Sequence, residues 1–153
     1  GVNSGNNFQG NDCVSIGTSS GQNTQKDNAI AIGYGAGSNV QGTNSIAIGY
    51  QAGLPSQGTN SIAIGYNAAQ TNQLNDSIAI GYGAGQSTQG AGSISVGYFA
   101  GNIAQSSFSI AIGYGAAYTN QGQSAIAIGH DSGNNNQGSA SISIGERDRH
   151  STT

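Results

Sequence analysis

The chain has 153 residues, of which 27 are glycine, and only 6% of its residues are charged. A formal net charge of −3 excludes the basic surface that nucleic acid or an anionic membrane would require. No apolar run approaches the roughly 20 residues that span a bilayer. We therefore expect one domain with no nucleic-acid partner and no membrane span.

A short unit is repeated along the chain without a break in register. Glycine recurs every sixteen residues, and glutamine keeps the same step. Such a period is typical of a solenoid, in which one unit is stacked along an axis. Flexible glycine-rich linkers keep no register, so an ordered repeat is expected rather than disorder. The glycines of the register are Gly1, Gly17, Gly33, Gly49, Gly65, Gly81, Gly97, Gly113, Gly129 and Gly145.

Each unit reads Gly-Tyr-x-Ala-Gly-x-x-x-Gln-Gly-x-x-Ser-Ile-Ala-Ile. Large apolar residues alternate with small ones before the next glycine, which predicts a short strand. A second short strand is expected near the glutamine. Two strands and two turns per unit predict an all-β fold, a parallel β-solenoid of about nine coils over residues 1–144. Residues 145–153 replace the unit with charged residues and are expected to form a C-terminal cap or junction.

The columns of the repeat predict what lies inside each coil. We expect isoleucine to fill the interior and the Ala/Ser column between the isoleucines to form a flat, free face. Another chain would pack closely on that face, or on the face across the coil, so an obligate homo-oligomer is predicted. The predicted core ladder is Ile30, Ile32, Ile46, Ile48, Ile62, Ile64, Ile78, Ile80, Ile110 and Ile112.

Two further columns carry side chains of one kind. Stacked glutamine amides can hydrogen-bond along the axis, so an amide ladder is predicted. Its residues are Gln25, Gln41, Gln57, Gln73, Gln89, Gln105 and Gln121. A tyrosine column follows the glycines and could either recognise a ligand such as a sugar or only stabilise the stack. Its residues are Tyr34, Tyr50, Tyr66, Tyr82, Tyr98 and Tyr114.

Residues that could carry chemistry are few. His130 and His150 have no Cys or His at ligand spacing, and Gly33-Tyr34-Gly35 opens no helix, so it is not a phosphate loop. We expect no catalytic site, no metal site, no cofactor and no enzyme activity. The lone Cys13 cannot form an internal disulfide. It is either a small buried residue or a thiol that identical chains bring together at a shared axis.

The strand and its glycine resemble a known family. Ser45-Ile46-Ala47-Ile48-Gly49 and its copies resemble the YadA-like head repeat of trimeric autotransporter adhesins, whose motif is Ser-Val-Ala-Ile-Gly. The repeat also resembles repeats of fibre-like proteins of phages and large viruses. The resemblance covers essentially the whole chain. It implies a left-handed parallel β-roll, three chains about a common axis, and a place on a bacterial surface or virion fibre.

Three hypotheses for function follow. The first is a non-enzymatic structural and adhesive fibre segment, a rigid trimeric rod that presents a repetitive surface to a host cell, matrix or glycan. The second is a self-assembling solenoid that forms filaments. The third is an ice-binding protein, for which regular threonine ladders would be expected, whereas the threonines here fall in several columns.

Overall fold

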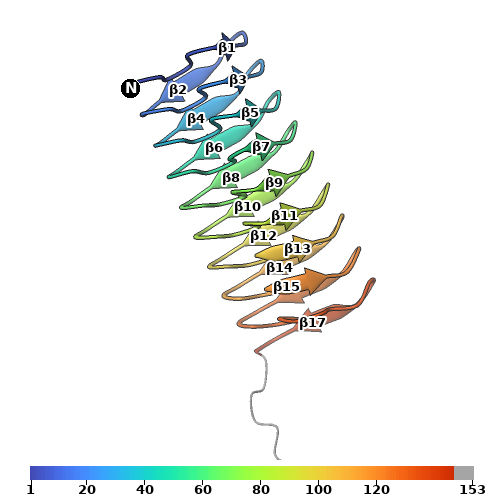
Figure 1. The fold of residues 1–153 in the computed structure, drawn as a ribbon. Coiled ribbons are helices and arrows are strands. Elements are labelled where there is room, and N and C mark those ends of the chain that lie inside the picture. The colour runs from blue at the N-terminus through green and yellow to red at the C-terminus, as the bar shows by residue number, and fades with distance from the viewer. Residues whose placement is uncertain (147–153) are drawn as a thin grey trace, which may run out of the picture.

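The computed structural model describes residues 1–146 as a straight stack of coils built from two parallel sheets (Figure 1). No helix occurs in that range. Each strand pairs with the equivalent strand of the next coil, sixteen residues on, as Ile46 pairs with Ile62 and Gln41 with Gln57. This register confirms the predicted all-β solenoid of about nine coils.

We call the nine-stranded sheet the isoleucine sheet. It contains the Ser-Ile-Ala-Ile segments, whose strands end where the register glycine turns the chain. Its strands are β2 (Val14–Ile16), β4 (Ile30–Ile32), β6 (Ile46–Ile48), β8 (Ile62–Ile64), β10 (Ile78–Ile80), β12 (Ile94–Val96), β14 (Ile110–Ile112), β16 (Ile126–Ile128) and β17 (Ile142–Ile144).

We call the eight-stranded sheet the glutamine sheet, because every strand in it ends on a glutamine. It is the second short strand expected in each unit. Its strands are β1 (Phe8–Gln9), β3 (Thr24–Gln25), β5 (Val40–Gln41), β7 (Ser56–Gln57), β9 (Asn72–Gln73), β11 (Thr88–Gln89), β13 (Ile103–Gln105) and β15 (Thr119–Gln121).

The interior of the coils corrects the predicted core. The fully buried apolar residues are alanines, and the Ala/Ser column points inward with Ala47, Ala63 and Ser95 at 0% exposure. The isoleucines point outward and are half-buried or exposed. The prediction was therefore inverted for Ile30, Ile32, Ile46, Ile48, Ile62, Ile64, Ile78, Ile80, Ile110 and Ile112. The Ala/Ser column is not a free face either.

The width of the coil explains this inversion. In each complete coil a glutamine side chain spans the whole interior, and Gln57 Nε2 donates to the carbonyl oxygen of Ile46 on the opposite strand at 2.7 Å. Only a small side chain fits between that amide and the facing strand. Because side chains on a strand alternate between faces, placing Ala47 inside places both flanking isoleucines outside.

The register glycines close the turn after the isoleucine sheet, as predicted. Gly65 has a φ of +132°, and a Cβ atom built on it would collide with the carbonyl oxygen of Gly81 in the next coil. Glycine is therefore required twice over, for its backbone conformation and for the close approach of stacked coils.

The C-terminal boundary stays a prediction. Gly145 and Glu146 are described, but the rest of the predicted charged cap, residues 147–153, lies outside the described residues. Over residues 1–146 there is no helix long and apolar enough to cross a membrane.

Candidate recognition surface

The buried glutamines fix the shape of each coil and so position the side chains on its outer surface. Each one from Gln25 to Gln137 donates from Nε2 to a carbonyl oxygen across the coil at 2.6–2.9 Å. The same nitrogen lies 2.9–3.4 Å from the carbonyl oxygen four residues on. These bonds tie both sheets and one turn together, so every coil has the same cross-section.

The predicted axial bonds between amides are present in part of the ladder. Four such bonds of 3.1–3.3 Å are present: Gln9 to Gln25, Gln73 to Gln89, Gln105 to Gln121, and Gln121 to Gln137. Gln41 and Gln57 make no such bond to a neighbouring glutamine within the described residues. The sequence argument found the ladder but missed its cross-coil bonds, which every complete coil makes.

The isoleucine columns form a regular outer surface that we call the isoleucine face. It consists of the two outward positions of each strand in the isoleucine sheet, filled by Ile except at Val14 and Val96. Nine strands at about 4.8 Å spacing make a strip on the order of 40 Å long. The face is flat and uncharged, since charged residues occupy none of these positions.

The glutamine sheet presents a different outer surface. Its outward column is mainly short polar side chains, with Ser56, Asn72 and Thr88 all exposed. Its apolar members are Phe8 and Val40, which are exposed, and Ala104. The chain therefore has one apolar broad face and one mainly polar broad face. The sequence analysis did not predict this difference, because it placed the isoleucines inside the coil.

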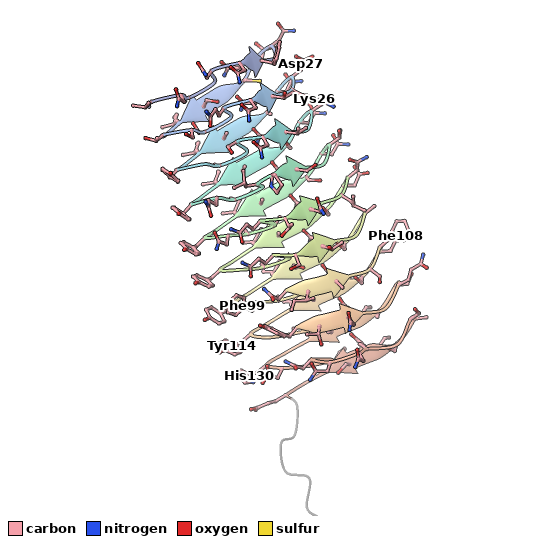
Figure 2. The ribbon with its side chains drawn as sticks, viewed as in Figure 1. Lys26, Asp27, Phe99, Phe108, Tyr114 and His130 are labelled. Atoms are coloured by element: carbon pink, nitrogen blue, oxygen red, sulfur yellow. The ribbon has the colours of Figure 1, made fainter. Side chains whose placement is uncertain are left out.

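The tyrosine column forms a continuous stack at the corner after the isoleucine sheet. Successive rings from Tyr34 to Tyr114 have centroids 4.9–5.3 Å apart and planes within 17° of parallel. His130 continues the stack, 4.9 Å from Tyr114. Figure 2 shows Tyr114 and His130 at this corner, with Phe108, Lys26 and Asp27 at the opposite one. We call these seven rings the aromatic ladder.

The stacking decides which parts of the rings are accessible. Each inner ring has both faces covered by its neighbours, yet the tyrosines remain 42–53% exposed. Exposure is therefore at ring edges and phenol hydroxyls. A sugar lying flat on a ring face, the usual aromatic contact, has no room along the ladder. A row of hydroxyl groups at the coil spacing is what remains.

Further side chains at this corner were not singled out from the sequence. Phe99 makes edge contacts with Tyr82, Tyr98 and Tyr118, with centroids 4.6–5.9 Å apart. Gly83 makes room for it, because a Cβ atom there would collide with the Phe99 ring. The sequence does contain a feature that could have pointed to Phe99: it occupies a repeat position that holds glycine at Gly35, Gly83 and Gly115.

A second amide ladder runs beside the tyrosines. Gln86 donates to Gln70 at 2.8 Å, and Gln70 donates to Gln51 at 3.1 Å. Asn102 continues the row by donating to Gln86 at 3.0 Å. The three glutamines are part-buried and Asn102 is buried, so the aromatic ladder has a fixed polar flank.

The reactive residues are placed as follows. Cys13 Sγ donates to the carbonyl oxygen of Lys26 at 3.0 Å, in a column that the central coils fill with buried serine or alanine, such as Ser45 and Ala125. It therefore points into its coil, which disfavours a shared-axis thiol. His130 Nδ1 lies 3.7 Å from Asp131 and 4.0 Å from Glu146. Residues 1–146 hold no group of three or more His, Cys, Asp or Glu able to bind a metal ion.

Comparison with known proteins identifies the repeat. A family model described as the YadA head domain repeat matches residues 14–36, 25–52 and 56–69. No curated protein and no solved structure matched the chain. The matched segments contain the Ser-Ile-Ala-Ile-Gly strands and the turns that carry Tyr34, Tyr50 and Tyr66. Within residues 14–69 the chain therefore carries a YadA-like head repeat, which confirms the resemblance read from its strands and glycines.

Proposed function

We propose that the chain is a structural, non-enzymatic segment of a surface fibre, in which three copies pack through the isoleucine face to form a rigid rod used for attachment. The observation that carries the proposal is the outward direction of the isoleucines. Contiguous exposed apolar surface of this extent marks an interaction site in soluble proteins.

The shape of the isoleucine face favours association about one axis. The face is a long and narrow strip, only two isoleucine columns wide. Three such strips that converge on a central axis each contact two others, so all the isoleucines enter one apolar core. Full burial of an isoleucine contributes about 1.5–3 kcal/mol relative to exposure. The isoleucines of the central coils are already part-buried in the single chain, so association adds only the remaining share of that value, repeated over nine coils. The YadA-like repeat supports a trimer and a place on the cell surface.

The test is the mass of the purified chain in solution and its response to charge on each face. We expect a trimer by light scattering and sedimentation. The pair Ile48→Asp and Ile64→Asp should dissociate it, because carboxylates cannot enter an apolar core without partners. The matched pair Ser56→Asp and Asn72→Asp adds the same charge to the polar face of adjacent coils and should leave the mass unchanged.

Other outcomes would overturn the proposal. A folded wild-type monomer at micromolar concentration removes the need for a shared core. Long filaments by electron microscopy would favour the assembly hypothesis instead. Dissociation by the polar-face pair would place the contact on the glutamine sheet. These results depend on the wild-type chain or on exposed positions, so they are informative even if the isoleucine variants fail to fold.

A further inference from the structure

The aromatic ladder has the repeat of a particular class of polymer. Its rings recur every 4.9–5.3 Å along the rod axis, and their planes deviate from parallel by only 7–17°. The rise per sugar of an extended β-1,4-linked polysaccharide is close to the spacing between β-strands. A chain of this kind laid along the axis would therefore meet one tyrosine per sugar without losing register.

We propose that the aromatic ladder binds an extended β-1,4-linked polysaccharide, of the chitin or cellulose class, aligned with the rod. The inference rests on the proposed attachment function, because it requires the ladder to stay outside the contact between chains. It names the ligand class that the fibre would recognise.

The contact is made by hydroxyl groups rather than by ring faces. The inner rings cover one another, while the tyrosine residues remain 42–53% exposed, so ring edges and hydroxyls are what a ligand can reach. A phenol hydroxyl both donates and accepts hydrogen bonds. Successive sugars of a β-1,4 chain are turned over, so each tyrosine must match alternate edges of the sugar. A group that is both donor and acceptor meets either edge.

The ladder is ordered before a ligand arrives. Stacking fixes the ring planes, and the buried glutamines give every complete coil one cross-section. The flanking row of Gln51, Gln70 and Gln86 is joined by hydrogen bonds of 2.8 and 3.1 Å. Side chains that are already ordered lose little entropy on binding, which favours affinity from weak repeated contacts.

The straightest part of the ladder locates the site. From Tyr34 to Tyr82 the ring planes differ by 7–10° per step, whereas the step from Tyr82 to Tyr98, beside Phe99, is 17°. The site is therefore the run from Tyr34 to Tyr82, and a chain that continues past Phe99 must shift. Affinity should rise with each added sugar up to the length of the straight run and then level off.

The experiment measures binding of the full purified chain to insoluble polysaccharides and to soluble oligosaccharides of increasing length. Chitin and cellulose are the β-1,4 arms and distinguish the two sources. Starch and a β-1,3-glucan, whose chains coil, are the mismatched arms. We expect binding to at least one β-1,4 polymer and none to the mismatched polymers.

A hydroxyl-deletion variant tests the mode of contact. Tyr50→Phe, Tyr66→Phe and Tyr82→Phe together keep the stacked rings and remove three hydroxyls, so binding should weaken about tenfold or more. The matched control, Ser56→Ala, Asn72→Ala and Thr88→Ala, removes three exposed polar groups from the same coils on the other sheet. Its binding should equal that of the wild type.

The outcomes separate this inference from the proposed function. Equal binding to starch or β-1,3-glucan, or full binding by the phenylalanine variant, overturns the inference. A trimer that attaches to cells or matrix but ignores both β-1,4 polymers also overturns it, while the proposed function stands. A chain that neither forms a trimer nor attaches to any surface defeats the proposed function itself.

Discussion

The two sheets of the solenoid repeat with the same sixteen-residue period but place their polar and apolar side chains on opposite sides. The glutamine sheet sends its largest polar side chain inward and short polar side chains such as Asn72 outward. The isoleucine sheet sends alanine or serine inward and two isoleucines outward. The Nε2 atoms of the interior glutamines donate to backbone carbonyl oxygens, as in Gln41, Gln57 and Gln73, while the isoleucines of the exterior have no place in the interior.

The difference shows that the interior of a coil is filled without the largest apolar side chains of the repeat. The interior of a narrow coil is filled by hydrogen-bonded amides and alanines, which suit a space one side chain wide. The isoleucines are left on the outer surface, where the contact proposed between chains would bury them. The same comparison identifies substitutions that should affect one sheet and spare the other.

The largest effect is expected at the turn that follows the isoleucine sheet. Gly65→Ala would add a Cβ atom against the carbonyl oxygen of Gly81 at a φ of +132°, so it should cost about 3 kcal/mol or more in the free energy of unfolding. Gly58→Ala, after the glutamine sheet, also brings a Cβ atom to 2.5 Å from the carbonyl carbon of Leu74, but the φ of Gly58 is not positive, so the cost should be smaller, about 1–2 kcal/mol. The column of Gly58 already accepts Lys26 and Leu74, so the backbone there adjusts to a side chain.

The measurement is the midpoint of thermal unfolding at one fixed protein concentration, because association also affects stability. Equal losses for the two alanine variants would mean that the two turns are equally tight, and the argument from positive φ would be wrong.

The second largest effect tests whether stability depends on the inward glutamine side chain or only on the strand that carries it. Gln57→Leu removes the bonds from Nε2 to the carbonyl oxygens of Ile46 and Ser61, at 2.7 and 3.3 Å. Ser61 keeps a bond from the backbone nitrogen of Ile46, so the expected loss is about 2 kcal/mol. Ser56→Leu makes the same side chain on the outer surface of the same strand and should change stability by less than about 0.5 kcal/mol.

Chemical denaturation of both leucine variants would check this, with circular dichroism to verify that the β content is unchanged. A Gln57→Leu chain as stable as the wild type would show that apolar packing replaces the amide, and that the cross-coil bonds do not hold the sheets together.

Periodicity alone predicted the coil length, both strands, the turn glycines and the glutamine and tyrosine ladders. It could not predict which side of the isoleucine strand faces inward, because alternation places Ile46 and Ala47 on opposite sides without saying which side is inside. The interior width decides that, and it is set by how far Gln57 reaches across the coil. The flank of Gln70 and Gln86 was missed because the column they occupy also holds Leu54 and Tyr118.

The smallest effect concerns the single inward position that varies between serine and alanine in the isoleucine sheet. Ser95 donates to Gln105 Oε1 at 2.6 Å, and Ser15 does the same to Gln25. In the coils with alanine, the Oε1 atoms of Gln41, Gln57 and Gln73 are buried and have no hydrogen-bond partner within residues 1–146. The chain thus contains both states of one site in otherwise equivalent coils.

Exchanging the two residues should change stability in opposite directions. Ala47→Ser supplies a donor to Gln57 Oε1 and should stabilise by about 1 kcal/mol, whereas Ser95→Ala leaves Gln105 Oε1 unpaired and should destabilise by about as much. Both positions lie between inward alanines, Ala31 and Ala63 in one case and Ala79 and Ala111 in the other, so packing along the axis is matched. The expected shift in the unfolding midpoint is about 2–4 °C each way. A loss of stability in Ala47→Ser would show that the interior is too narrow there for one more oxygen. The Oε1 atoms without a partner would then result from close packing, and no hydroxyl group could be added beside them.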